Sequence, residues 1–140
     1  MYLLDTDHLS VLERGGAEAV RLRRRLQAVS PDEVAATVIS YEEQTRGWLS
    51  YIARSRSPEE QVTAYGYFQR HLKVFCAVPL IAFDPAAAAV VQHLQRQRIR
   101  IGTMDLKIAS IALAQGASLL SRNVIDFQQV PGLRVEDWTA

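Results

Sequence analysis

Short apolar runs alternate with longer helical patterns along the chain. Four runs have the length and composition of buried strands, at residues 1–4, 34–39, 80–83 and 117–121, and a further short strand is expected within 131–135. Between these runs, apolar residues recur every three or four positions, which is the period of an amphipathic helix. Alternating strands and helices predict a parallel sheet with helices on both faces, so the expected fold class is α/β.

Capping residues indicate where the helices begin and end. Asp7 is a natural N-cap for the helix that follows the first strand, and Gly116 is a plausible end of the helix after Gly102. Ser57 is followed by proline, and Glu60 stands three places after it, which is the pattern of a capping box. Asp84 precedes another proline in the same way. The chain therefore carries local signals for most of its helix boundaries.

One carboxylate stands at the start of an otherwise apolar helix. In the stretch from Gly102 to Ala114, the residues Met104, Ile108 and Ile111 share one helical face, and Asp105 lies in the first turn. An ionised acid beside an apolar face is costly unless it is paired or hydrogen-bonded, so its presence needs a reason. We therefore treat Asp105 as a candidate functional residue.

A second acid, Glu43, has two interpretations. Ser40 followed by Glu43 forms a capping-box pattern, in which the carboxylate would only bond the helix backbone. Alternatively, Gly47 lies one turn later on the same face and leaves open space beside the carboxylate, as a functional residue would need. Spacing alone does not separate the two interpretations.

Two more acids follow strand-like runs. Asp5 comes directly after the first run, and Asp126, close to Asn123, follows the run at 117–121. Each could simply be a turn residue. In an open parallel sheet, however, the carboxyl ends of the strands lie at one edge, where ligands bind. The topology could therefore bring these acids together with Glu43 and Asp105.

Four clustered carboxylates would repel one another unless a cation compensated them. Oxygen-only ligands favour a hard divalent metal, Mg²⁺ or alternatively Mn²⁺, whereas softer metals prefer His or Cys. Such ions activate water and stabilise a leaving oxygen in phosphoryl chemistry. The candidate reaction is therefore hydrolysis of a phosphodiester bond.

Composition sets the limits of this hypothesis. The chain has 140 residues, 49% hydrophobic and 22% charged, which suits one globular domain spanning residues 1–140. A formal charge of +1 provides no overall basic field for nucleic acid, so any such site must be local. Cys76 is the single cysteine and no apolar run is long enough to span a membrane, so we expect a cytoplasmic protein without membrane contact.

Four motifs in order resemble those of the PIN-domain ribonucleases, and in particular the VapC-type toxins of type II toxin–antitoxin systems. The motifs are Leu3–Asp7, Val38–Glu43 followed by Gly47, Gly102–Ala109, and Ser121–Phe127 with the tail after it. Two positions depart from the family pattern, because Asp7 replaces the usual Asn and Asn123 stands where many relatives carry Asp. The resemblance covers nearly the whole chain.

This resemblance implies a three-layer α/β/α domain with a short parallel sheet. It also implies a Mg²⁺-dependent endoribonuclease that forms a homodimer and is inhibited by an antitoxin protein bound in the acidic groove. Asp5 and Asp105 would hold the metal, and Glu43 and Asp126 would position or deprotonate the attacking water. Thr6, Ser121 and Asn123 would support them, with the fourth acidic position shared between Asn123 and Asp126.

Two other functions fit parts of the sequence. Asp5-Thr6-Asp7 also matches the start of the haloacid-dehalogenase phosphohydrolase motif, in which one Asp attacks phosphorus. That chemistry needs a downstream lysine, and only Lys73 and Lys107 are available. The second alternative is a catalytically inactive PIN module that binds RNA or protein.

Overall fold

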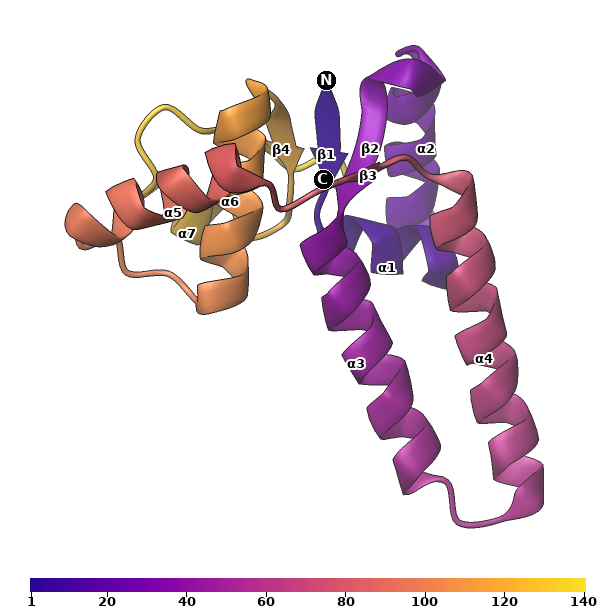
Figure 1. Cartoon of the computed structure of the whole chain (residues 1–140). Coiled ribbons are helices and arrows are strands. Elements are labelled where there is room, and N and C mark those ends of the chain that lie inside the picture. Colours follow the sequence, from indigo (N-terminus) through magenta and orange to yellow (C-terminus); the bar gives the residue numbers. More distant parts are fainter.

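Five short strands form one parallel sheet in the computed structural model, which describes residues 1–140 (Figure 1). The strands are β1 (Tyr2–Leu4), β2 (Val34–Thr37), β3 (Leu80–Ile81), β4 (Ser118–Leu120) and β5 (Arg134–Glu136). Their order in the sheet is β3-β2-β1-β4-β5, so the first strand of the sequence is the central one. All four strand pairs are parallel, as the alternating pattern predicts.

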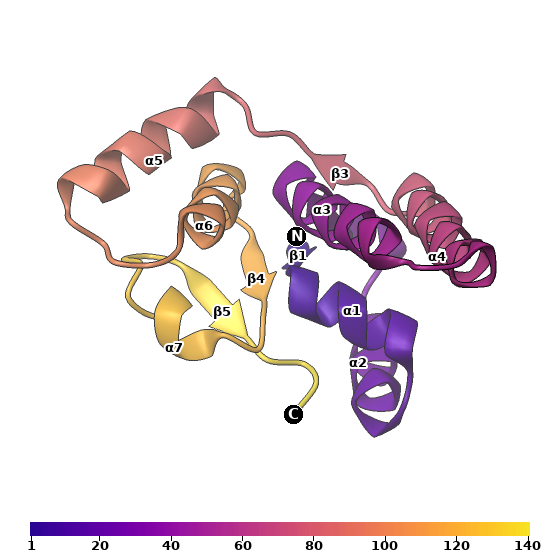
Figure 2. The same ribbon diagram turned by 90° about the horizontal axis from the view of Figure 1, so that it is seen from below.

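Seven α-helices connect and cover the strands. They are α1 (Thr6–Arg14), α2 (Ala17–Gln27), α3 (Val38–Arg54), α4 (Pro58–Ala77), α5 (Pro85–Arg96), α6 (Thr103–Gln115) and α7 (Val124–Phe127). Figures 1 and 2 show α5, α6 and α7 gathered at one end of the molecule, with the antiparallel pair α3 and α4 at the other. None of the helices combines the length and apolarity needed to span a membrane.

Alternate residues of the central strands point to opposite faces of the sheet, and each face has its own core. Leu3 pairs in register with Ala35 and Leu119, and these three pack against residues of α5 and α6. The next residue, Leu4, belongs to the opposite core, which is completed by α1, α2 and Phe75 of α4. The helices therefore form two layers around the sheet, which confirms the predicted α/β/α architecture.

Two predicted helix starts are wrong, and hydrogen bonds explain both. The second strand ends at Thr37, because the Thr37 hydroxyl accepts the Ser40 N–H at 3.1 Å and so caps a helix that begins at Val38. The first helix is capped by Asp5, whose Oδ1 accepts the Thr6 N–H at 2.8 Å, and Asp7 lies inside the helix. In each case the cap comes earlier in the chain than the pattern predicts.

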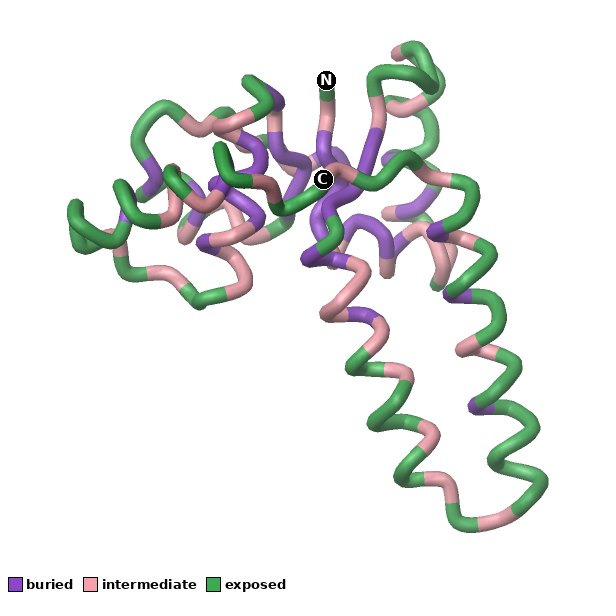
Figure 3. The backbone as a smooth tube through the Cα atoms, viewed as in Figure 1, coloured by how far each residue is buried: buried purple, intermediate pink, exposed green.

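The α3–α4 pair extends far beyond the sheet (Figure 1). Its buried residues are few, and the outer turns of both helices are mostly exposed (Figure 3). Trp48 of α3 stacks on Tyr67 of α4 with 5.2 Å between the ring centroids, and this contact joins the two helices. The α4 N-terminus confirms the predicted cap, since the Ser57 hydroxyl accepts the Glu60 N–H at 3.1 Å.

Candidate active site

The carboxyl ends of β1 and β4 bring the first candidate residues together. Leu4 lies opposite Leu120 in the register, so the residues that follow them, Asp5 and Ser121, are neighbours. The Asp5 N–H donates to the Leu120 carbonyl at 2.9 Å, and the Ser121 hydroxyl donates to Asp5 Oδ2 at 2.7 Å. Both oxygens of Asp5 are therefore hydrogen-bonded, and its carboxylate is fixed at the edge of the sheet.

Asp5 is a buried acid with unusual titration behaviour. Asp5 is only 5% exposed. Burial raises its pKa from 3.8 to about 7, and the nearby charge of Asp7 adds to this rise. The hydrogen bonds from Ser121 and Thr6 oppose this shift but do not cancel it. A cation bound beside Asp5 would remove the cost of its charge.

Glu43 joins this edge through Thr6. The Thr6 hydroxyl donates to Glu43 Oε1 at 2.8 Å, across 37 positions of sequence. Because Thr37 caps α3, the interpretation of Ser40 and Glu43 as a capping box is wrong. The adjacent Glu42 instead forms an ion pair with Arg46 at the surface, which leaves Glu43 as the acid of this helix that reaches the site.

Asp105 lies on the other side of the site, and the side-chain amide of Asn123 connects it to Asp126 by hydrogen bonds. The Asn123 side-chain NH₂ donates to Asp126 Oδ2 at 3.0 Å and to Asp105 Oδ2 at 3.4 Å. Burial raises the pKa of Asp105, and the charges of Glu43 and Asp126 raise it further. All four acids singled out in the sequence therefore lie in one neighbourhood.

Asp7 and His8 are not among the predicted site residues, but hydrogen bonds connect them to this edge of the sheet. His8 is fully buried, and its Nε2 accepts the Trp138 N–H at 3.1 Å. In the neutral ring Nδ1 then carries the hydrogen, and it donates to Asp7 Oδ1 at 2.8 Å. Asp7 Oδ2 accepts the Arg122 N–H at 3.0 Å. No local pattern could reveal this arrangement, because the partner of His8 lies 130 positions away.

A polar pocket of about 410 Å³ opens over these residues and contains no hydrophobic side chain. Its nine lining residues are Asp5, Thr6, Asp7, Ser10, Arg14, Glu43, Asp105, Arg122 and Asn123. Asp126 stands behind Asn123 rather than in the lining. The Arg122 side chain is held by Glu18 through contacts of 3.2 and 3.3 Å, whereas Arg14 has no ion-pair partner. We call this the acidic pocket.

The donor set of the acidic pocket suits Mg²⁺ or Mn²⁺. It offers carboxylate, hydroxyl and amide oxygens without His or Cys in the lining, which is the ligand chemistry of a hard cation. No three acidic, His or Cys side chains converge into a complete metal cage. Mg²⁺ does not require one, since it is commonly bound by one or two carboxylates and keeps several waters.

The haloacid-dehalogenase alternative lacks its phosphate anchor here. None of the nine residues that line the acidic pocket is a lysine. The cationic groups of the lining are Arg14 and Arg122, and Arg122 is already paired with Glu18. The lining therefore lacks the lysine that this chemistry requires.

A parallel sheet in this order, with acids gathered at the carboxyl ends of its strands, gives the chain the PIN-like α/β fold that the resemblance implies. No family model matches the sequence. The chain is 28% identical to the ribonuclease VapC1 of Rickettsia felis, over 95% of this chain and 92% of that protein.

Solved structures agree with this similarity. VapBC-1 from nontypeable Haemophilus influenzae aligns with a TM-score of 0.71 and 24% identity, over 99% of this chain and 98% of that one. A toxin–antitoxin complex from Klebsiella pneumoniae aligns with a TM-score of 0.70 and 25% identity, over 99% and 98% of the two chains. The resemblance to VapC-type PIN-domain proteins that the motifs indicate is confirmed.

Proposed function

We propose that this protein is a Mg²⁺-dependent endoribonuclease and the toxin of a type II toxin–antitoxin pair. The observation that carries the proposal is the acidic pocket, in which Asp5, Glu43 and Asp105 meet from three separate elements. The similarity to a protein named ribonuclease VapC1 over nearly the whole chain supports the same chemistry. Mn²⁺ is expected to replace Mg²⁺, because the ligands are oxygens.

Asp5 and Asp105 are the proposed metal ligands. Both have a raised pKa because of burial and neighbouring negative charge, so a cation would stabilise their ionised forms. When bound, the metal would stabilise charge on the phosphate and lower the pKa of a water. Thr6 and Ser121 hold two of the carboxylates in place by donating to Glu43 and Asp5.

Glu43 is the proposed base for the attacking water. Its Oε1 accepts the Thr6 hydroxyl, which orients the carboxylate and leaves Oε2 to accept a proton. Asp126 acts through Asn123, whose NH₂ group contacts both Asp126 and Asp105. In this arrangement Asn123 fills the position nearest the pocket and Asp126 supplies the charge behind it.

We further propose that the protein forms a homodimer and binds an antitoxin partner that covers the acidic pocket. Two of the similar solved structures are those of VapBC-1 and of a toxin–antitoxin complex. Size-exclusion chromatography with light scattering, with and without a co-expressed antitoxin, tests both assemblies. A monomer that does not associate with the antitoxin contradicts this part of the proposal.

The central experiment is an RNA cleavage assay with purified protein free of antitoxin. We expect Mg²⁺ and Mn²⁺ to support cleavage, EDTA to abolish it, and Asp5→Asn and Asp105→Asn each to reduce it by about 10³-fold or more. Circular dichroism checks that both variants are folded. If the wild-type protein binds RNA but leaves a broad panel uncut with either metal, the alternative of an inactive binding module is correct.

A further inference from the structure

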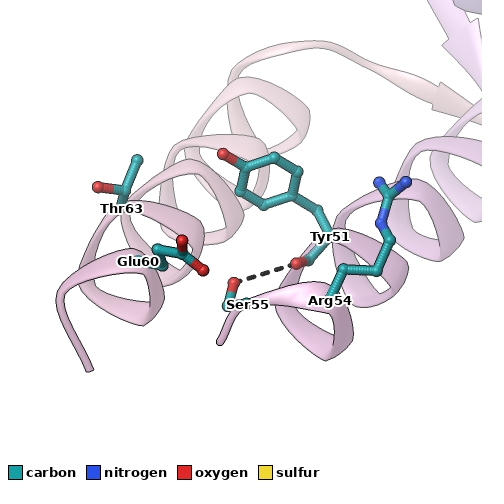
Figure 4. Close-up of a pocket in the computed structure, with 5 residues that line it drawn as sticks. All are labelled: Tyr51, Arg54, Ser55, Glu60 and Thr63. Atoms are coloured by element: carbon teal, nitrogen blue, oxygen red, sulfur yellow. Dashed lines mark hydrogen bonds between the residues drawn. The ribbon is translucent and has the colours of Figure 1, made fainter. Parts of the chain in front are cut away.

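Two further pockets follow the acidic pocket along α3. A second pocket of about 230 Å³ shares Ser10 with the acidic pocket, and Gly47 forms part of its wall. A third pocket, of about 440 Å³, lies farther along the α3–α4 pair and shares Tyr51 and Arg54 with the second. Figure 4 shows Tyr51 and Arg54 on the same stretch of α3, with Glu60 and Thr63 supplied by α4. We call the second pocket the Gly47 pocket.

Gly47 keeps this pocket open. It lies inside a long helix, where glycine is less favourable than alanine, and its φ is not of the kind that requires glycine. A Cβ atom built at Gly47 meets nothing within 4 Å, so close packing does not explain the residue either. A side chain at position 47 would fill the pocket.

The outer wall of the Gly47 pocket is suited to a flat, aromatic ligand with a phosphate. Trp48 and Tyr51 line it, with 5.9 Å between their ring centroids, and Tyr51 is 38% exposed. Arg54 lines it too and has no ion-pair partner. Aromatic rings beside a free guanidinium are how proteins hold single-stranded nucleic acid.

The inner wall carries hydrogen-bond acceptors that lack donors. Gln44, only 8% exposed, donates through Nε2 to Ser10 Oγ at 3.2 Å and to the Thr6 carbonyl at 3.5 Å. Its Oε1 is buried without a partner, and so is Oε1 of Glu13, whose pKa is raised by burial. Buried polar atoms without partners are uncommon, and a ligand bearing N–H groups would satisfy them.

We propose that the Gly47 pocket binds one nucleobase of a single-stranded RNA whose scissile phosphate lies in the adjacent acidic pocket. The ring would stack on Trp48 or Tyr51, Arg54 would contact the following phosphate, and Gln44 and Glu13 would accept from the base edge. Guanine presents two adjacent donors, N1–H and N2–H, on that edge, one for each of these two acceptors. The inference rests on the proposed nuclease function and names how that site selects its substrate.

The test fills the pocket without removing any contact. Gly47→Leu places a side chain in the pocket, and Gly66→Leu is the matched control, because Gly66 also lies inside a long helix with nothing within 4 Å of an added Cβ. Both changes raise helix propensity, so neither should lower the melting temperature. A pool of short RNAs with randomised sequence, cleaved and then sequenced, reports both rate and base preference.

We expect Gly47→Leu to raise KM by about 5- to 100-fold and to abolish a guanine preference beside the cleaved bond. Its affinity for Mn²⁺, measured by calorimetry, should equal that of wild type, and Gly66→Leu should change neither quantity. Replacing the preferred guanine by inosine, which lacks the 2-amino group, should weaken cleavage by wild type.

Several results would overturn the inference while leaving the nuclease proposal intact. One is a Gly47→Leu variant that cleaves with the KM and base preference of wild type. Another is a variant that cleaves normally but no longer binds a co-expressed antitoxin, which would assign the pocket to a protein partner. A preference for a base other than guanine would overturn the assigned edge contacts. If wild type cleaves no RNA at all, the proposed function itself fails.

Discussion

Two helices deliver acids to the same pocket but are built in opposite ways. The 13-residue α6 has six buried residues, and its acid, Asp105, lies in the first turn beside this buried face. The 17-residue α3 has only three buried residues, Ile39, Ser40 and Gln44, all in its first half. Glu43 lies in that first half, and the rest of the helix extends with α4 into solvent (Figure 3).

The packed helix α6 holds its acid in a fixed position, whereas α3 holds Glu43 with its first half and extends beyond the site with its second half. Residues that must stay fixed for chemistry lie where a helix is packed against the sheet. Farther along α3, apolar and aromatic side chains such as Leu49 and Tyr51 remain exposed, at 50% and 38%. Side chains this exposed contribute little to the packed core, so their substitution changes stability little. The two halves of α3 should therefore respond differently to substitution.

The largest difference is expected between two neighbouring acids of α3. Glu43→Gln removes the proposed base and should lower kcat for RNA cleavage by about 10²- to 10⁴-fold. Glu42→Gln loses only a surface ion pair with Arg46 and should change kcat less than about twofold. Multiple-turnover cleavage with saturating RNA and Mg²⁺ measures both kcat values. Equal losses in the two variants would contradict the assignment of Glu43.

A second pair of variants compares how much α6 and the projecting half of α3 contribute to the free energy of unfolding. Ile111→Ala in α6 removes a side chain that is 1% exposed and should lower the free energy of unfolding by about 2–5 kcal/mol. Leu49→Ala in α3 should change it by less than about 0.5 kcal/mol. Urea denaturation measures both values. A large loss at Leu49 would show that the outer half of the hairpin is part of the folding core.

The pH dependence of stability tests the burial of Asp5. Its pKa is raised in the folded state, to about 7, so its contribution is most favourable below about pH 4 and is lost as the pH rises to 7. In metal-free buffer, Asp5→Asn should therefore be more stable than wild type at pH 8 by about 2–4 kcal/mol. Near pH 4 the two should be alike.

Adding Mg²⁺ at pH 8 provides the control for this prediction. A ligand that binds only the folded protein raises its stability, so the melting temperature of wild type should rise more than that of Asp5→Asn. Melting curves followed by circular dichroism give both comparisons. If the stability of the wild-type protein without metal is constant from pH 4 to pH 8, the pKa of Asp5 is not raised by folding.

The smallest effect is expected at the helix caps. Thr37→Ala removes the fully buried cap of α3 and should cost about 2 kcal/mol, whereas Ser57→Ala at the exposed start of α4 should cost about 0.5–1 kcal/mol. Thermal denaturation of the two single variants measures the difference. If Ser57 proved the more costly cap, the outer end of the hairpin would contribute more to stability than its burial indicates.

The architecture followed from the sequence because its signals are local. Apolar runs gave the strands, glycine and proline marked helix ends, and the parallel arrangement followed from alternation. The wrong boundaries came from competing caps. Val38 and Ile39 continue the apolar run of β2, and only the hydrogen bond between Thr37 and Ser40 turns the chain into a helix there.

The acids could be identified from sequence patterns, and the family resemblance added Thr6, Ser121 and Asn123 as supporting residues, but which of these contacts which acid could not be predicted. Thr6 contacts Glu43, and Ser121 contacts Asp5, over separations of 37 and 116 positions. The same holds for His8, whose ring orientation depends on the backbone of Trp138. Such contacts depend on strand order and register, which a pattern of hydrophobic positions does not specify.

The central place of β1 has a consequence for synthesis. Its neighbour β4 lies at residues 118–120, so β1 can pair only with β2 until most of the chain has been translated. Asp105, Ser121 and the backbone of Trp138 are also made late. A nascent chain that has folded its first half would carry Asp5 and Glu43 but no complete acidic pocket. If the protein cleaves RNA, a ribosome translating it is not exposed to the finished site until residues through Trp138 have emerged.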